Sequence, residues 1–254
     1  SIALSLADKI DTLVGFFGIK LKPTSSKDPF ALRRASLGII RLIVENNKDF
    51  KIKELINYSL LLYQEQGFQF NEKIVLNELS EFFFERLKFY MKEKKIRSDI
   101  INSGLSSFSI DNINMIYKKS LAINKVINLE LGQDVISSYK RSSNILENET
   151  KTQEIKLSES TDPGIFKSEY EKNLYKKIKE LRKYFLNISR DDDEDYNETL
   201  KNLASIKKPV FEFFDNIIVN DQDLSIRKNR LELIQMLCKT FENYINFSKI
   251  ESVK

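Results

Sequence analysis

The sequence contains no histidine, one cysteine, four prolines and seven glycines among its 254 residues. Without histidine, the chain lacks the usual general base, the commonest transition-metal ligand and any histidine-based catalytic triad. The lone Cys238 excludes an internal disulfide and agrees with a reducing compartment. Because glycine and proline are scarce, long loops and sheet-forming turns are few, and helix is the expected structure.

The sequence also has no long apolar run and little excess charge. No segment approaches the roughly 20 apolar residues of a membrane-spanning helix, and no charged and then apolar leader opens the chain. The net charge of +4, from 41 basic and 37 acidic side chains, is too small to indicate nucleic-acid binding by itself. An RNA site would therefore be local. The chain begins inside an amphipathic pattern, so we expect a fragment of a longer protein.

Apolar residues recur at intervals of three and four along the chain, which is the spacing of amphipathic helices. The clearest case covers residues 166–186. Asp28 followed by Pro29 predicts a helix start, Asn71 predicts the cap of a long helix, and Gly67 predicts the end of the helix before it. No strand pattern and no solenoid repeat is found. The sequence predicts an all-α protein.

The second half of the chain shows two polar interruptions. The sequence predicts helices over about 110–131 and 134–146, and a flexible connection over about 147–164, which is polar and lacks periodicity.

The acidic run 191–195 resembles a magnesium site, but contiguous carboxylates in a loop do not converge on one ion. Acidic residues favour the positive end of a helix dipole, so this run predicts a solvated helix entrance. The last helix is expected from Leu224 to about Phe247.

Four segments carry more specific patterns: LADKIDTLVGFF (6–17), KPTSSKDPFALRRASLGIIRL (22–42), YKRSSNIL (139–146) and PVFEFFDNIIVNDQDLSIRKNRL (209–231). In this order they resemble the C-terminal part of the β subunit of bacterial glycyl-tRNA synthetases. The resemblance runs from the end of an HD-type helical domain through the anticodon-binding domain. It covers almost the whole chain and is thinnest between residues 148 and 197.

The resemblance implies two parts, with residues 1–107 in the HD-type and body helical region and residues 108–254 in a helical-bundle anticodon-binding domain similar to that of arginyl-tRNA synthetases. In the family, two α and two β subunits join glycine to its tRNA in the cytoplasm. ATP and Mg²⁺ act on the α subunit. The expected partners are therefore glycine tRNA and the α subunit, with no catalytic residue, metal or cofactor in this fragment. The sequence agrees, since it contains no GxxxxGK[ST] and no GxGxxG motif.

Asp8 and Asp11 raise the alternative of an HD-type phosphohydrolase. In such enzymes a late aspartate completes a metal site formed with two histidines and another aspartate. No histidine exists here, and a lone carboxylate does not hold a catalytic divalent ion. We therefore expect a structural role for both aspartates.

Tyr139, Lys140, Arg141 and Asn144 lie on one predicted helix of the anticodon-binding part. An anticodon is an unstacked single-stranded loop, which proteins read by stacking on aromatic or guanidinium planes and by hydrogen bonds to base edges. These four side chains have the right chemistry and are candidates for tRNA contact. Packing within the helix bundle is the alternative for half of them.

Arg227, Lys228 and Arg230 begin the last helix, after Asp221 and Asp223. They are also candidates for tRNA contact. A salt bridge from Arg227 or Arg230 that holds the preceding acidic turn is an equal alternative.

In the first part of the chain, Arg34 and Arg41 share one helical face, with Arg33 beside them. Arginines next to an apolar stripe suit RNA phosphate and an interdomain carboxylate about equally. Two other patterns favour ordinary roles. A basic cluster predicts a solvated helix face, with contact to the tRNA backbone as the alternative; it comprises Arg86, Lys88, Lys92, Lys94, Lys95 and Arg97. Phe211, Phe213 and Phe214 resemble stacking platforms, but their helical spacing predicts core.

Two functions stay open at this point. The first is recognition of tRNA without catalysis. The second is an assembly scaffold that contacts the α subunit, which the weak net charge and the 41% hydrophobic content favour.

Overall fold

The computed structural model of the chain describes residues 2–24, 26–152, 156–188 and 195–252. All regular elements among these residues are helices, which confirms the predicted fold class. The chain divides into two compact units, Ser1–Ser120 and Leu121–Lys254. The domain boundary at residue 107 stays a prediction, because the limits of a compact unit do not define the limits of a family domain.

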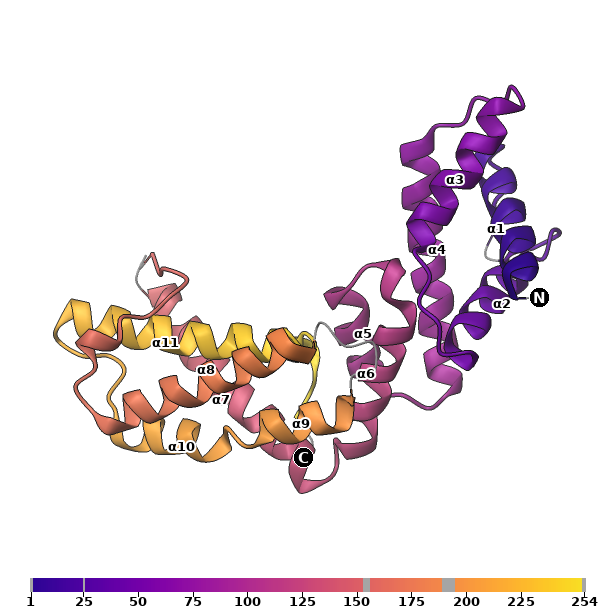
Figure 1. The fold of residues 1–254 in the computed structure, drawn as a ribbon. Helices are drawn as coiled ribbons and strands as arrows, with labels where there is room; N and C mark the ends of the chain where they lie inside the picture. Colours follow the sequence, from indigo (N-terminus) through magenta and orange to yellow (C-terminus); the bar gives the residue numbers. More distant parts are fainter. Residues whose placement is uncertain (1, 25, 153–155, 189–194, 253–254) are drawn as a thin grey trace. The chain divides into compact units, whose positions relative to one another are not determined.

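The first unit is a packed group of helices, coloured indigo to magenta in Figure 1. Helix α1 packs against α2, α3 and α4, and α2 and α3 also pack against α4. Leu13, Ile39, Ile43 and Phe83 are fully buried between them. The unit contains α1 (Ile2–Gly18), α2 (Leu32–Glu45), α3 (Ile52–Glu65), α4 (Glu72–Glu93), α5 (Ser98–Ser107), η1 (Ile110–Asn112) and the start of α6 (Ile113–Val126).

The start of α2 differs from the prediction. The helix begins at Leu32, and Ala31 before it has a left-handed φ of 56°. Asp28 still caps the helix from one turn away, because its Oδ1 and Oδ2 accept hydrogen bonds from the backbone N–H groups of Leu32 (2.9 Å) and Arg33 (3.0 Å). A predicted start at Asp28 and Pro29 is therefore wrong, while the capping role of the carboxylate is correct.

Two other predicted boundaries are confirmed. Asn71 caps α4, since its side chain accepts a hydrogen bond from the Ile74 backbone N–H at 3.1 Å. Gly67 follows α3 with a φ of 89°, a conformation that costs glycine nothing.

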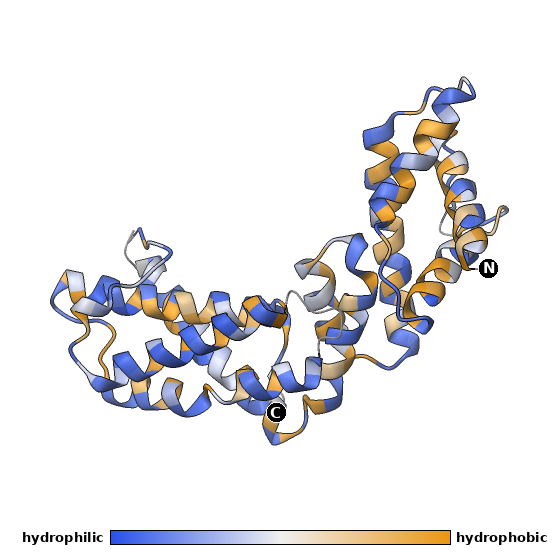
Figure 2. Ribbon diagram, in the orientation of Figure 1, coloured by the Kyte–Doolittle hydropathy of each residue, from blue (hydrophilic) through white to orange (hydrophobic). Residues whose placement is uncertain are grey.

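The second unit is a bundle in which α11 packs on α7 and α8, while α10 packs on α8 and α7, and α9 on α7. Figure 2 shows hydrophobic and hydrophilic positions alternating around these helices, as amphipathic packing requires. The unit contains the end of α6, α7 (Glu130–Thr152), η2 (Pro163–Ile165), α8 (Glu169–Ile188), α9 (Tyr196–Ala204), α10 (Lys207–Asn216), α11 (Leu224–Glu242) and η3 (Phe247–Lys249).

The break between α6 and α7 lies earlier than predicted. Helix α6 ends at Val126, and α7 already begins at Glu130. Gly132 permits this turn, because a Cβ atom there would overlap the carbonyl oxygen of Val126. A side chain at this position would push the two helices apart.

Helix α7 also ends later than predicted. The prediction of a flexible connection that starts at residue 147 is therefore wrong. The extra turn is held by an ion pair from Lys151 to Glu147 at 3.2 Å and by a hydrogen bond from Thr150 Oγ1 to the Leu146 carbonyl at 2.7 Å. Residues 153–155 lie outside the described residues.

The acidic run at 191–195 is only partly described. Residues 191–194 lie outside the described residues. Asp195 is the N-cap of α9, and its Oδ1 accepts hydrogen bonds from the backbone N–H groups of Asn197 (2.9 Å) and Glu198 (3.3 Å). For Asp195, the predicted position at a helix entrance is confirmed.

Candidate nucleic-acid interface

Arg141 presents a guanidinium plane at the surface of the second unit. Its Cζ lies 4.9 Å from the ring centre of Phe211 and 5.1 Å from that of Phe214, both on α10. Its Nη2 donates a hydrogen bond to Asp215 Oδ1 at 2.7 Å. Cation–π contact with two rings restricts the position of the guanidinium, while an exposed ion pair of this kind contributes at most about 1 kcal/mol. The side chain of Arg141 stays 32% exposed.

The three phenylalanines of α10 therefore have different roles. Phe213 is fully buried, as the sequence predicts. Phe211 and Phe214 are only half-buried and support the guanidinium of Arg141.

Tyr139 lies in the core. It is 3% exposed, and its ring contacts Phe241 and Phe247. Its hydroxyl donates a hydrogen bond to Glu242 Oε1 at 3.1 Å. Burial and, to a smaller extent, the nearby Glu242 carboxylate raise the pKa of the Tyr139 phenol. The ring offers no face to an RNA base in this fold, which is the packing alternative that the sequence left open.

Lys140 and Asn144 lie beside Arg141 on α7. The side chain of Lys140 is half-buried and that of Asn144 is exposed. Residues four apart lie on the same face of a helix, so these two side chains point the same way. Contact of Lys140, Arg141 and Asn144 with RNA stays a prediction.

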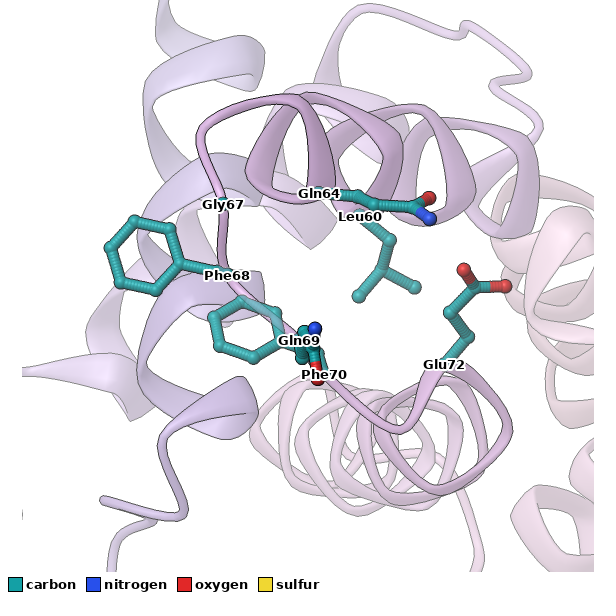
Figure 3. A pocket seen from close by; sticks show the side chains of 7 residues that line it. All are labelled: Leu60, Gln64, Gly67, Phe68, Gln69, Phe70 and Glu72. Carbon is teal, nitrogen blue, oxygen red and sulfur yellow. The ribbon is translucent and has the colours of Figure 1, made fainter.

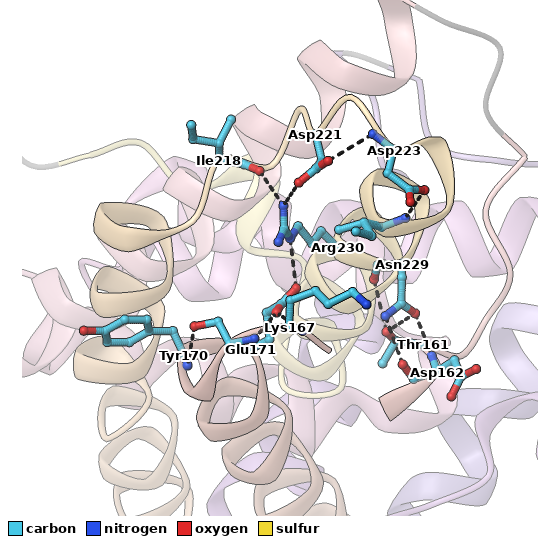
Figure 4. Close-up of polar contacts among 12 residues, drawn as sticks. Thr161, Asp162, Lys167, Tyr170, Glu171, Ile218, Asp221, Asp223, Asn229 and Arg230 are labelled. Atoms are coloured by element: carbon cyan, nitrogen blue, oxygen red, sulfur yellow. Dashed lines mark hydrogen bonds and ion pairs between the residues drawn. The ribbon is translucent and has the colours of Figure 1, made fainter. Parts of the chain in front are cut away.

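Arg230 is buried and connects three segments of the second unit (Figure 4). Its Nε donates to Glu171 Oε1 at 2.8 Å, and its Nη1 donates to Asp221 Oδ2 at 2.7 Å and to the Ile218 carbonyl at 2.9 Å. A buried guanidinium with charged and carbonyl acceptors is a structural group. Arg230 therefore holds the acidic turn before α11, which was one of its two predicted roles.

Glu171 has a second role at the start of α8. Its Oε2 accepts hydrogen bonds from the backbone N–H groups of Lys167 and Ser168, both at 2.8 Å, and Ser168 Oγ accepts from the Tyr170 N–H at 3.2 Å. This is a capping box, in which the serine accepts from an N–H group of the first turn, and the glutamate three residues later accepts from the N–H groups of the serine and of the residue before it. One carboxylate thus starts α8 and attaches it to α11.

The other two basic residues at the start of α11 differ in exposure. Arg227 is buried, and its Nη2 contacts Glu149 Oε2 on α7 at 2.6 Å. Lys228 is exposed, with its Nζ 3.9 Å from Glu232 Oε1. Of the three predicted candidates at this helix start, Lys228 is the one whose charge faces solvent.

The later residues of the 147–164 segment, which the structure describes from residue 156 onward, are hydrogen-bonded to α11 (Figure 4). Thr161 Oγ1 donates to Asn229 Oδ1 at 2.8 Å, and Asn229 Nδ2 donates to the Asp162 carbonyl at 2.9 Å. The backbone N–H of Ser158 also donates to Glu232 Oε1 at 2.9 Å.

The basic residues of the first unit lie on its surface or contact neighbouring side chains. Arg34 and Arg41 on α2 are exposed, and Arg41 Nη2 lies 3.9 Å from Glu93 Oε2. In the basic cluster of α4, Lys94 lies over the ring of Tyr90 at 5.3 Å. These contacts neither require nor prevent binding to phosphate.

The first unit contains a pocket of about 280 Å³ between the end of α3 and the start of α4 (Figure 3). Its lining offers one carboxylate, two amides and apolar groups, and no cation: Leu60, Gln64, Gly67, Phe68, Gln69, Phe70 and Glu72. Asp11 lies outside this lining and accepts a hydrogen bond from Ser59 Oγ at 3.2 Å. In the described part of the chain, no group of three residues is arranged to hold a metal ion.

Sequence reasoning missed one feature of the second unit. The face of α8 opposite its buried stripe carries a row of exposed lysines: Lys172, Lys176, Lys179 and Lys183. The signal was present in their spacing of four, three and four residues, which places them on one face of a helix.

None of the helices in the described segments is both long and apolar enough to cross a membrane.

Comparison with known families divides the chain in the same order as the two units. Residues 1–106 match the family described as glycyl-tRNA synthetase beta subunit, and residues 135–254 match the DALR anticodon binding domain.

Among its relatives, the glycine–tRNA ligase beta subunit of Rickettsia africae (strain ESF-5) is 35% identical over 247 residues, which are 97% of this chain and 34% of the relative. The corresponding subunit of Rickettsia peacockii (strain Rustic) is 36% identical over 248 residues, with the same coverage. That of Rickettsia prowazekii (strain Madrid E) is 34% identical over 247 residues, again 97% of this chain and 34% of the relative. The chain thus spans about a third of the length of these relatives. Its two matched segments and its all-helical fold show that it belongs to the glycyl-tRNA synthetase beta subunit family and carries a DALR anticodon binding domain.

Proposed function

We propose that this chain is the tRNA-binding, non-catalytic part of a glycine–tRNA ligase β subunit, and that its second unit recognises the anticodon arm of glycine tRNA. The observation that carries the proposal is the DALR anticodon binding match over residues 135–254. These residues lie within one compact unit. In this proposal the complete cytoplasmic enzyme contains two α and two β subunits, and ATP, Mg²⁺ and glycine bind to the α subunit.

The surface around Arg141 supports the proposal through its chemistry. Its guanidinium lies over the rings of Phe211 and Phe214, so its position is restricted before RNA arrives. Unstacked bases bind to aromatic and guanidinium planes, and an amide such as that of Asn144 can hydrogen-bond to base edges. Lys140, one turn from Asn144, adds a positive charge.

A second function is favoured for the first unit by a separate observation. Large apolar side chains are exposed there, among them Tyr58 (63%), Leu61 (53%) and Phe68 (46%). Exposed apolar groups of this size are typical of surfaces that bind another protein. Contact with the α subunit is the corresponding proposal for this unit.

Fluorescence anisotropy tests the tRNA proposal directly. The chain is titrated with an anticodon-arm hairpin of glycine tRNA and with a hairpin whose anticodon bases are altered, each at two salt concentrations. We expect salt-sensitive binding that is weaker for the altered hairpin, because base contacts distinguish the two RNAs and phosphate contacts do not. Equal affinity for both hairpins would refute base recognition, and no binding to either would leave the scaffold function alone.

A further inference from the structure

Helix α8 carries a continuous row of positive charge on its outer face. The lysine row consists of Lys172, Lys176, Lys179 and Lys183, all exposed. At a rise of about 1.5 Å per residue, the eleven steps from the first lysine to the last cover about 16 Å. The row is therefore long enough to follow several phosphates along one nucleic-acid strand, which in double-stranded DNA are spaced by about 3.4 Å along the axis.

The orientation of the lysine row is fixed by the opposite side of α8. Leu174, Ile178 and Leu181 are buried against the bundle. Glu171, in the first turn, is held by Arg230 of α11 at 2.8 Å. Because both the apolar stripe and this ion pair point inward, the helix cannot rotate without breaking them.

The acidic residues of α8 neutralise little of this charge. Glu171 is buried and paired with Arg230. Glu169 contacts Lys172 at 2.8 Å, at one end of the row, and Glu180 contacts Lys177 at 3.5 Å, outside the row. Among the described residues, no ion pair is formed by the other three lysines of the row.

We propose that the lysine row binds the phosphate backbone of a tRNA stem without reading its sequence. The inference rests on the proposed function, because the same unit carries the anticodon-binding match. Lysine is a compact charge that suits phosphate, and the row contains no aromatic ring and no amide to read a base. An anionic membrane is a poorer partner, since a helix that binds membranes inserts its apolar face, and that of α8 is buried in the bundle.

The proposal divides binding between two surfaces of one unit. The lysine row contributes charge that is equal for every tRNA. The surface around Arg141 and Asn144 contributes discrimination between anticodons. Substitutions in the two surfaces therefore change different measured quantities.

The test is an anisotropy titration of the full chain with the two hairpins described above, over a series of salt concentrations. In the double variant K176Q/K179Q, we expect the slope of log K against log salt to fall by about two, since each lost phosphate contact lowers it by about one. The dissociation constant at about 0.1 M salt should rise on the order of tenfold. It should rise by the same factor for both hairpins, because no base contact is removed.

Two further variants serve as controls. K176R/K179R keeps the charge and should keep the slope. K201Q/K208Q removes the same charge from exposed lysines on α9 and α10, and should leave binding within about twofold of the wild type. Circular dichroism melts should give all of these variants the thermal midpoint of the wild type, because every substituted side chain is exposed.

The outcomes separate this inference from the proposed function. If the wild type binds no hairpin, the proposed function fails. If the wild type binds and K176Q/K179Q binds equally well, only the lysine row is refuted. An equal loss in K201Q/K208Q would also refute it, since general charge would then explain the effect. Wild-type binding to vesicles of phosphatidylserine and phosphatidylcholine that K176Q/K179Q loses, with RNA binding unchanged, would assign the row to a membrane instead.

Discussion

The Nε of Arg230 on α11 and the Oε1 of Glu171 on α8 lie 2.8 Å apart, and both side chains are almost fully buried. Each has further partners, since Arg230 also binds Asp221 and Glu171 also caps its own helix. This pair, and not a contact with RNA, explains why an arginine stands at this position of the last helix.

Arg230→Met should destabilise the chain by about 3–5 kcal/mol, because it leaves the carboxylate of Glu171 buried without its cation. Urea unfolding followed by circular dichroism measures the change. The exposed Lys228→Gln is the control and should change the free energy of unfolding by about 0.5 kcal/mol or less. A loss below about 1 kcal/mol for Arg230→Met would contradict the structural role.

Asp221 should make the stability depend on acidic pH. A hydrogen bond from the backbone N–H of Asp223 and, to a smaller extent, the guanidinium of Arg230 hold the pKa of the Asp221 carboxyl below its usual 3.8. A lowered folded-state pKa contributes stability above the unfolded value, and this stability is lost as the pH falls through the folded-state pKa. Asp221→Asn should therefore lose less stability than the wild type when urea unfolding is compared at about pH 5 and about pH 2. Parallel losses in the two proteins would argue against this contribution.

Asp215 should compete with RNA for Arg141. Its carboxylate is exposed and accepts a hydrogen bond from the guanidinium at 2.7 Å. Because an exposed pair of this kind is worth at most about 1 kcal/mol, Asp215→Asn should lower the dissociation constant of the cognate hairpin by up to about fivefold. Glu212→Gln removes the same charge from the same helix, where Glu212 pairs with Lys208 at 3.7 Å. Equal tightening in both variants, or weaker binding in Asp215→Asn, would show that RNA does not take the place of Asp215.

Gly132→Ala should destabilise the second unit by about 1–3 kcal/mol, the usual cost of an added methyl group in a site without space. Its Cβ would overlap the carbonyl oxygen of Val126, where α6 turns into α7. The unfolding midpoint in urea measures the effect. Ser137→Ala, at an exposed position of the same helix, is the control and should change stability little. If both variants have the same unfolding midpoint in urea, the close approach at Gly132 is not required.

Cys238 should be unreactive in the folded chain. Burial, followed by the Glu242 carboxylate, raises the pKa of its thiol to about 12, so almost no thiolate is present at about pH 8. Ellman's reagent should detect no thiol until urea unfolds the protein. An introduced exposed cysteine, Ser137→Cys, should react at once. Since the folded-state pKa is raised, stability should be complete below about pH 9 and fall above it, as the unfolded thiol ionises.

Local signals predicted the parts of the fold that depend on local chemistry. The cap at Asn71 and the left-handed Gly67 need only their own neighbours, and both are found. The end of α7 depends on a contact distant in the sequence as well as on the local contacts of Lys151 and Thr150. Glu149, in its last turns, pairs with Arg227, which is 78 residues away. No pattern within residues 147–152 indicates such a partner.

The sequence predicted the chemistry of the candidate site better than the positions of its side chains. By their chemistry, Tyr139 and Asn144 are equally suitable for contact with RNA. The side chain of Tyr139 is nevertheless buried, while that of Asn144 is exposed. Tyr139 follows the buried Val135 by one helical turn, which is a signal for packing. The lysine row was not predicted, although the spacing of its lysines places them on one face of α8.

The three-way anchorage of Arg230 has a consequence for how an alanine scan of this surface should be judged. Its guanidinium sets the rotation of α8 through Glu171 and the course of the 218–221 loop through two further bonds. Removing it would take away one of the two restraints on the direction of the lysine row, and under the proposed function RNA binding would then weaken although the arginine is buried. Such a scan would wrongly count Arg230 among the residues that contact RNA. A stability measurement on the same variant distinguishes a residue that orients the lysine row from a residue that binds phosphate itself.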